Sequence, residues 1–343
     1  MSERELAATA AAMVAPGKGI LAIDESSGTI KKRFDSIGLE SNVENRRAYR
    51  DLLITAQGLS EYISGMILYD ETIKQGTKSG TAFPAALKSA GILTGIKVDA
   101  GSKPLAGAPG EQVTEGLDGL RERLTEYKKL GATFAKWRAV ITITDDLPSD
   151  YCISVNAHAL ARYAALCQEA DIVPIVEPEV LMDGNHTLER SLSVTEKTLH
   201  VLFDELYRQR VRYEHLVLKA SMVISGQECA QQASVQQVAD ATVLCLKRTV
   251  PATVPGIVFL SGGQSDELAT AHLNAMNAGS AKLPWPLSFS YGRALQAPAL
   301  KAWKGQAGNV PAAQKALYHR SKLNSAATFG RYKPEMEKEA LAA

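Results

Sequence analysis

Short apolar runs alternate with longer amphipathic stretches along most of this 343-residue chain. The runs are rich in Ile, Val, Leu, Phe or Trp, the side chains that favour buried strands. They predict eight strands, over residues 19–24, 64–70, 93–99, 134–143, 172–180, 215–223, 256–263 and 283–292. The amphipathic stretches predict helices, among them residues 45–58, 117–130, 155–169, 187–210, 234–249 and 265–277.

Alternating strands and helices predict a parallel sheet whose crossovers are right-handed. Eight such strands favour an α/β fold of the (β/α)8 TIM-barrel type, which typically takes ~250 residues, over a doubly wound open sheet. Further helices are expected over residues 2–15 and 310–326, and Asn156 is expected to cap the helix over 155–169. No linker divides the chain, so we expect one domain over residues 1–343 with a polar C-terminal tail over 331–343.

Composition narrows the class of protein. Apolar residues make up 45% of the chain, charged residues 22%, and the net charge is +1, which gives no reason to expect nucleic-acid or membrane partners. No apolar run approaches the ~20 residues that span a bilayer, and the N-terminus lacks the apolar core of a signal peptide. The four cysteines are widely spaced, which is typical of reduced thiols in a cytoplasmic protein. The six histidines are scattered, so we expect no metal site built from neighbouring residues, and the alternative is a site assembled from distant ones. No cofactor is expected.

One predicted strand ends in a lysine, Lys219. A lysine in this position often only reaches solvent, but it can also attack a carbonyl carbon and form a Schiff base. Attack requires the neutral amine, which burial and a neighbouring cation favour. Lys136, at another strand end, is a candidate for that cation, or for a group that stabilises negative charge on oxygen.

Two predicted strands end in polar pairs spaced i, i+2, namely Lys136 with Arg138 and Glu177 with Glu179. Side chains two residues apart on a strand point the same way. Burying these two carboxylates opposite two lysines is costly unless the charges pair, which favours a working site over a helix-capping or salt-bridging pair. Like charges held together raise the pKa of one carboxyl, which suits an acid–base catalyst. Asp24, which ends the first predicted strand, is either a further base or a turn cap.

Two groups of residues resemble phosphate sites. Loops after the seventh and eighth strands of a barrel commonly bind phosphate through backbone N–H groups, and here they carry Ser261, Gly262, Gly263, Ser290, Gly292 and Arg293. A second group, beyond the first and third strands, consists of Ser26, Thr29, Lys32, Arg33 and Lys97. The alternative for this second group is a solvated basic helix start. Two separate sites would imply a substrate phosphorylated at both ends. A glycine-rich segment, residues 101–119, is expected to form a long loop near them.

Six motifs occur in order: Leu-Ala-Ile-Asp-Glu-Ser, Gly-Ile-Lys-Val-Asp, Phe-Ala-Lys-Trp-Arg, Ile-Val-Glu-Pro-Glu, Leu-Ser-Gly-Gly-Gln-Ser and Phe-Ser-Tyr-Gly-Arg-Ala-Leu-Gln. By these motifs the chain, from Gly17 to about Arg331, resembles the class I fructose-1,6-bisphosphate aldolases. The resemblance implies a (β/α)8 barrel that needs no metal, with Lys219 as the Schiff-base lysine and Glu177 as general acid and base. It implies supporting catalytic roles for Lys136, Glu179 and Asp24.

The resemblance also implies where the substrate binds. The loops after strands seven and eight would hold its 1-phosphate. Its 6-phosphate end would lie near Ser26, Thr29, Lys32, Arg33 and Lys97, and the remaining substrate-binding candidates are Arg138 and Arg46.

The activity that the resemblance implies is reversible cleavage of fructose 1,6-bisphosphate to dihydroxyacetone phosphate and glyceraldehyde 3-phosphate, in glycolysis and gluconeogenesis. Its partners would be phosphorylated ketose and triose substrates and other copies of the chain in a homotetramer. Two features depart from the family: Ala220 follows the lysine where proline is frequent, and the chain does not end in tyrosine. Another lysine aldolase acting on a related sugar phosphate, and a non-catalytic phosphosugar-binding or scaffold protein, remain alternatives.

Overall fold

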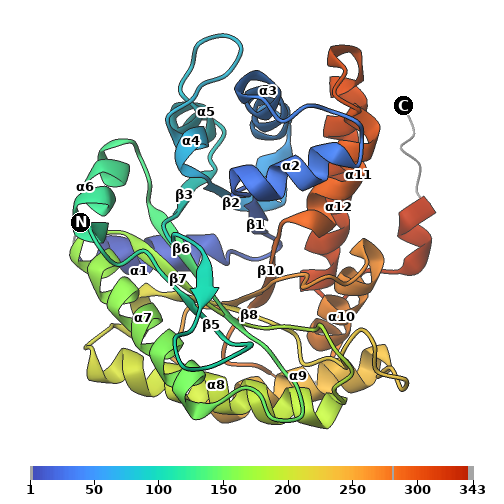
Figure 1. Cartoon of the computed structure of the whole chain (residues 1–343). Coiled ribbons are helices and arrows are strands. Elements are labelled where there is room, and N and C mark those ends of the chain that lie inside the picture. Colours follow the sequence, from blue (N-terminus) through green and yellow to red (C-terminus); the bar gives the residue numbers. More distant parts are fainter. Residues whose placement is uncertain (1–2, 280–281, 339–343) are drawn as a thin grey trace.

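Eight parallel strands close into a barrel in the order β1-β10-β9-β8-β7-β6-β3-β2 (Figure 1). The computed structural model describes residues 3–279 and 282–338, so residues 339–343 of the predicted tail lie outside it. The barrel strands are β1 (Gly19–Ala22), β2 (Ile63–Leu68), β3 (Leu93–Lys97), β6 (Phe134–Ile141), β7 (Val173–Val180), β8 (Val217–Ala220), β9 (Ile257–Phe259) and β10 (Leu287–Tyr291). All eight predicted strands form, and the barrel, not the open sheet, is the architecture.

Helices surround the barrel (Figure 1). They are α1 (Glu3–Met13), α2 (Ser27–Asp35), α3 (Val43–Ile54), α4 (Asp70–Ile73), α5 (Phe83–Ser89), α6 (Leu120–Lys129), α7 (Asp150–Glu169), α8 (Leu188–Arg208), α9 (Val235–Thr249), α10 (Asp266–Ala278), α11 (Arg293–Trp303) and α12 (Val310–Thr328). The helices predicted from periodicity all form. Residue 2, where the first was expected to begin, lies outside the described residues. The periodicity does not single out α2, α4, α5 and α11, of which α4 and α5 are short and α11 contains Pro298.

The expected cap of α7 is wrong. The helix begins earlier, at Asp150, and Ser149 caps it by accepting a hydrogen bond from the Cys152 amide at 3.1 Å. Asn156 instead lies inside the helix, where its side chain bonds to the backbone of Gln112 at 2.8 Å and of Thr114 at 3.2 Å. These bonds fix β5 (Gln112–Thr114), which pairs antiparallel with β4 (Ser102–Pro104) in the segment expected to be a plain loop.

The two ends of the barrel interior differ in polarity. At the N-terminal end, apolar side chains of α1 such as Met13 pack with strand residues such as Ile20 and Phe134. Phe134 fits because Gly95 lies beside it: a Cβ at Gly95 would stand 2.2 Å from the Phe134 ring. Charged side chains, among them Asp24, Lys136 and Lys219, lie toward the other end of the barrel interior.

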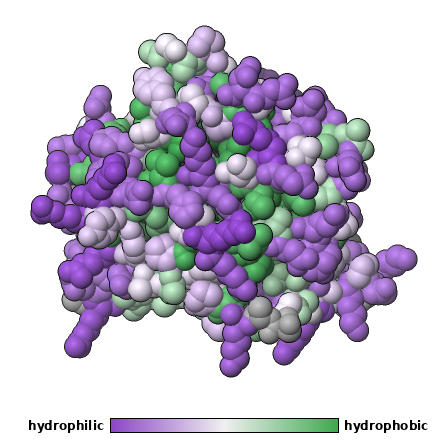
Figure 2. Space-filling view, turned by 90° about the horizontal axis from the view of Figure 1, so that it is seen from below, coloured by the Kyte–Doolittle hydropathy of each residue, from purple (hydrophilic) through white to green (hydrophobic). Residues whose placement is uncertain are grey.

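The outer surface is mostly polar on the side drawn in Figure 2, where apolar side chains show only in small areas between hydrophilic ones. Among the described residues, no helix combines the length and the apolar character needed to cross a membrane. Near the C-terminus, a 3-10 turn (Pro334–Lys338) is tied to α12, because Glu337 accepts hydrogen bonds from the buried Arg320 at 2.6 Å and from Tyr332 at 2.9 Å.

Candidate active site

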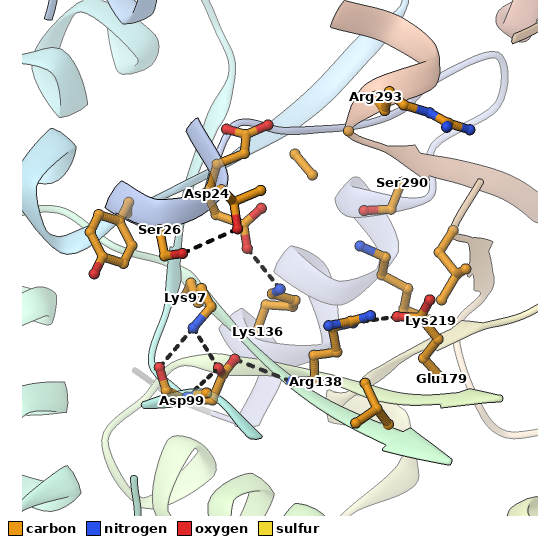
Figure 3. A pocket seen from close by; sticks show the side chains of 18 of the residues that line it. Asp24, Ser26, Lys97, Asp99, Lys136, Arg138, Glu179, Lys219, Ser290 and Arg293 are labelled. Carbon is orange, nitrogen blue, oxygen red and sulfur yellow. Dashed lines mark hydrogen bonds and ion pairs between the residues drawn. The ribbon is translucent and has the colours of Figure 1, made fainter. Parts of the chain in front are cut away.

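A cavity of about 580 Å³ opens where the barrel strands end (Figure 3). Parallel strands finish at the same end of a barrel, so residues far apart in sequence meet there. Four of the five predicted catalytic residues line it: Asp24 follows β1, and Lys136, Glu179 and Lys219 lie on β6, β7 and β8. The fifth, Glu177, lies in contact with two of them, as described next.

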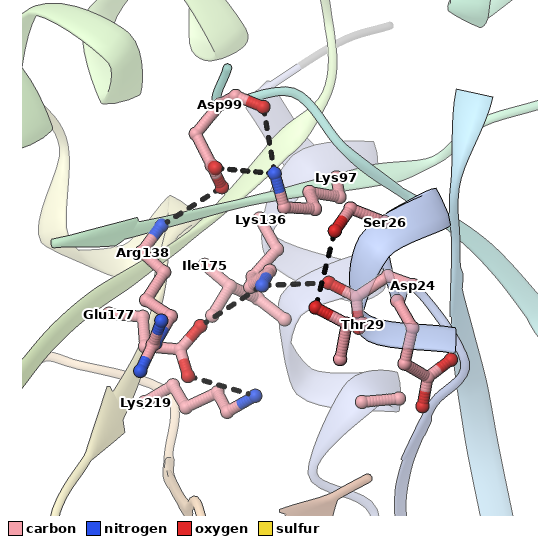
Figure 4. Close-up of polar contacts among 12 residues, drawn as sticks. Asp24, Ser26, Thr29, Lys97, Asp99, Lys136, Arg138, Ile175, Glu177 and Lys219 are labelled. Carbon is pink, nitrogen blue, oxygen red and sulfur yellow. Dashed lines mark hydrogen bonds and ion pairs between the residues drawn. The ribbon is translucent and has the colours of Figure 1, made fainter. Parts of the chain in front are cut away.

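Four charged side chains form a chain of ion pairs across the barrel (Figure 4). The Lys219 Nζ lies 3.1 Å from Glu177 Oε1, and the Lys136 Nζ lies 3.4 Å from Glu177 Oε2 and 2.7 Å from Asp24 Oδ2. The two lysines and Glu177 are almost completely buried. Each charge therefore depends on its neighbours, because water does not solvate it.

Within this row of ion pairs, neighbouring charges keep Asp24, Lys136 and Glu177 ionised. Burial alone would raise the pKa of Asp24, but Lys136 and Lys219 outweigh it and hold the value at about 2. Burial would lower the pKa of Lys136, yet the facing carboxylates, Asp24 and then Glu177, raise it instead. The pKa of Glu177 is lowered, since Lys219 and Lys136 outweigh burial. Lys136 is thus a fixed cation between two ionised carboxylates.

The expectation that the pairing of Glu177 with Glu179 raises the pKa of one of them does not hold for Glu177, whose pKa is lowered. Glu179 accepts a hydrogen bond from the Arg138 Nε, while Glu177 faces the two lysines, so each carboxylate has its own cations. Alternation along β7 predicted that the two carboxylates share a side of the strand. It could not predict which cations the neighbouring strands bring to each.

Asp99 belongs to the site although the sequence analysis did not select it. It accepts a hydrogen bond from the Lys97 Nζ, and its other oxygen accepts one from the Arg138 amide at 3.3 Å. The Lys97 Nζ also donates to the Asp99 carbonyl at 2.8 Å. The sequence did contain a clue to Asp99: it follows Lys97 by two residues at the end of a predicted strand, and such side chains point the same way.

The second predicted phosphate group, the one beyond the first and third strands, is only partly assembled at the cavity. Helix α2 brings Thr29 and Arg33, four residues apart, to the cavity wall beside Ser26, and Lys97 lines the same wall. Lys32 is exposed and does not line the cavity. Arg46 lies on α3 and does not line it either, since its guanidinium pairs with Glu71 at 2.6 and 2.8 Å.

Arg33 is itself held by a buried carboxylate that the sequence analysis missed. Glu25 lies 2.8 Å from Arg33 Nη1 and 2.7 Å from Arg50 Nη2, and it accepts a hydrogen bond from Gln296 at 2.7 Å. Burial would raise the pKa of Glu25, but Arg50 and Arg33 outweigh it and lower the pKa. The clue in the sequence was that Glu25 directly follows the candidate base Asp24.

Every member of the first predicted phosphate group, the one in the loops after strands seven and eight, lines the cavity. Its members come from the loop after β9 and from β10 with the start of α11: Ser261, Gly262, Gly263, Ser290, Gly292 and Arg293. The Ser290 hydroxyl is buried and has no hydrogen-bond partner among the described residues. Gly262 and Gly263 adopt positive φ angles of 54° and 96°, which favour glycine. In Figure 3, Ser290 and Arg293 lie toward one side of the lysines, and Ser26 and Lys97 toward the other.

This arrangement can support nucleophilic chemistry on an anionic carbonyl compound. A buried amine has a carboxylate at hydrogen-bond distance to accept its proton, and a fixed cation lies on the far side of that carboxylate. In the described part of the chain, no group of three or more His, Cys, Asp or Glu side chains could hold a metal ion.

Comparisons with known proteins agree with one another. The family model for fructose-bisphosphate aldolase class-I matches residues 5–343. A Xylella fastidiosa protein named "Probable fructose-bisphosphate aldolase class 1" is 63% identical over 97% of this chain and 100% of its own length. The Arabidopsis thaliana "Fructose-bisphosphate aldolase 4, cytosolic" is 52% identical over 97% of this chain and 85% of its own length.

A solved structure shows the same fold. It is the Plasmodium falciparum fructose-bisphosphate aldolase in complex with TRAP and a small-molecule inhibitor, with a TM-score of 0.95 and 49% identity. The match covers 96% of this chain and 95% of that one. This chain therefore belongs to the class-I fructose-bisphosphate aldolase family, a family of carbon–carbon lyases.

Proposed function

We propose that this protein reversibly cleaves fructose 1,6-bisphosphate to dihydroxyacetone phosphate and glyceraldehyde 3-phosphate through a Schiff base on Lys219. The observation that carries the proposal is the buried Lys219 amine 3.1 Å from Glu177, with Lys136 beyond it. Phosphate-binding candidates on opposite sides of these lysines suit a substrate phosphorylated at both ends. Family membership supports the substrate class.

The first half of the reaction forms the imine. Glu177 accepts a proton from Lys219, and the neutral amine attacks the C2 carbonyl carbon, whose oxygen takes the electron pair and then a proton from the attacking nitrogen. Lys136, held as a cation by Asp24 and Glu177, stabilises charge on that oxygen. Glu177 then returns its proton to the C2 hydroxyl, which leaves as water, and a cationic imine remains.

The second half breaks the carbon–carbon bond. Asp24 or Glu177, both with lowered pKa and therefore ionised, accepts the proton of the C4 hydroxyl. The electron pair of the C3–C4 bond moves into the imine and gives an enamine, while C4 leaves as the aldehyde carbon of glyceraldehyde 3-phosphate. Protonation of the enamine at C3 and hydrolysis release dihydroxyacetone phosphate and restore Lys219.

Borohydride trapping tests this proposal. Reduction in the presence of dihydroxyacetone phosphate should attach the triose to Lys219, as mapped by mass spectrometry, and Lys219→Ala should abolish both the adduct and turnover. Labelling of Lys136 instead would overturn the assignment. A phosphosugar-binding or scaffold protein would form no reduced adduct. A lysine aldolase for another sugar phosphate would form the adduct but would not cleave the bisphosphate.

The cellular setting is part of the same proposal. We infer that the protein acts in glycolysis and gluconeogenesis, in the cytoplasm and as a homotetramer. The match to the glycolytic aldolase family supports the pathway, and the cytosolic Arabidopsis relative supports the cytoplasm. Size-exclusion chromatography with light scattering tests the tetramer, and a monomeric mass would refute it.

A further inference from the structure

Gln264 lies near the end of the β9–α10 loop, residues 260–265, and its side chain bonds back to the start of that loop from inside the protein. Its side chain is buried, and it does not line the cavity. The backbone amide and the side-chain Nε2 both donate to the Ser261 carbonyl, each at 3.0 Å. The Gln264 carbonyl accepts a hydrogen bond from the Arg293 guanidinium. One residue therefore connects the start of this loop to the arginine at the start of α11.

His272 of α10 holds the Gln264 side chain in this orientation. The His272 Nδ1 lies 2.6 Å from Gln264 Oε1, and the ring is buried. Burial lowers the pKa of His272 to about 4, so the ring is neutral near pH 7. Because an amide oxygen only accepts, the ring proton is on Nδ1. The Nε2 then carries a lone pair, which agrees with its lack of a hydrogen-bond partner among the described residues.

The loop needs such a support because of its composition. Gly262 and Gly263 leave the backbone with many alternative conformations, and fixing it in one of them costs conformational entropy. A site that is already fixed before the ligand arrives binds more tightly, because that cost is not taken from the binding free energy. His272 stands eight residues from Gln264 and lies outside the cavity wall, so any effect it has on a ligand acts through Gln264.

We propose that Gln264 and His272 are positioning residues that fix the β9–α10 loop and Arg293 for the phosphate nearest to the Schiff base. This inference rests on the proposed function, in which that loop binds the 1-phosphate. It concerns affinity for the phosphate group, and not the reactivity of the Lys219 amine.

His272→Leu and His272→Asn form the test pair. Leucine removes the donor and leaves the buried Gln264 oxygen without a partner, which is costly. Asparagine presents an amide N–H at about the position of the histidine Nδ1 and should restore the bond. A third variant, Leu273→Ala, removes a core side chain of the same helix and serves as the control for general destabilisation.

Borohydride trapping is measured against the concentration of dihydroxyacetone phosphate and of dihydroxyacetone, which lacks the phosphate. For His272→Leu we expect about a tenfold higher half-saturating concentration of dihydroxyacetone phosphate, which corresponds to ~1.4 kcal/mol. The trapping rate at saturation and the trapping of dihydroxyacetone should change less than twofold. His272→Asn and Leu273→Ala should resemble the unsubstituted protein in every trapping measurement.

The proposal is overturned if His272→Leu leaves half-saturation unchanged, or if it weakens trapping of both compounds equally. If His272→Leu does not fold, Gln264→Glu serves instead. It keeps an acceptor for His272 but loses the amide donor to Ser261, and the same selective weakening is expected. Absence of any adduct in the unsubstituted protein would refute the proposed function. The positioning role would then be tested by the dissociation constant for inorganic phosphate. About tenfold weaker binding is expected for His272→Leu, and equal binding would overturn the proposal.

Discussion

Replacing Lys136 with methionine removes the cation that lies 2.7 Å from Asp24 and 3.4 Å from Glu177. Methionine has a similar length and fills much of the same space, so the main change is the loss of charge. Removing one partner of a buried ion pair typically costs ~3–5 kcal/mol, because the other charge stays buried without compensation. We expect Lys136→Met to lower the free energy of unfolding by about that amount at pH 7 and to abolish measurable cleavage.

The pH dependence of the stability loss shows whether the unpaired Asp24 carboxylate causes it. In the unsubstituted protein the pKa of Asp24 is about 2, below its ordinary 3.8. At ~1.4 kcal/mol for each pKa unit, this contributes about 2 kcal/mol of stability, present above pH 4 and lost as the pH falls from about 4 to 2. Without Lys136, we expect burial to outweigh the cations that remain, Lys219 and Lys97, and to raise the pKa of Asp24. The native variant then takes up a proton at higher pH, so the loss of stability should shrink as the pH is lowered.

Urea unfolding of both proteins at pH 7 and pH 5, at one protein concentration, measures this difference. Lys219→Met is the matched control. In the described part of the chain Lys219 pairs with Glu177, which still keeps Lys136, so we expect a smaller loss. The reasoning rests on the cost of breaking a buried ion pair. It would be refuted if Lys136→Met lowered the free energy of unfolding by less than about 1 kcal/mol, or by the same amount at both pH values.

Three further predictions concern the phosphate, the metal and the tail. Arg293→Ala removes a charge-assisted hydrogen bond worth ~1.5–3 kcal/mol, so kcat/KM for the bisphosphate should fall about tenfold or more; an unchanged value would show that Arg293 does not contact substrate. Activity should survive prolonged dialysis against EDTA, and a loss that added zinc restores would indicate a metal-dependent mechanism. Deleting residues 333–343 removes Glu337 from the buried Arg320, so Tm should fall while cleavage stays nearly unchanged. A tenfold loss of activity in the folded truncated protein would contradict this.

Local sequence determined much of this protein. The alternation of apolar runs and amphipathic stretches predicted all eight barrel strands, because a strand buried on both sides needs apolar residues throughout. The charged residues in these runs could also be read directly, and Lys136, Glu177 and Lys219 do lie on barrel strands, while Asp24 lies just after one. Since parallel strands of a barrel finish together, their meeting followed from the fold class.

Only the tertiary structure decided which of these charges pair and which residues support them. Lys32 and Arg33 are adjacent and alike in sequence, yet the turn of α2 brings Arg33 to the cavity and leaves Lys32 in solvent. Asn156 appeared as a helix cap because its residue type suits one, but its partner backbone lies about forty positions away in sequence. The Gln264–His272 bond has no recognisable pattern at all. Which side chains become partners depends on the distances between helices and strands in the folded protein. Residue type and local spacing give no information about those distances.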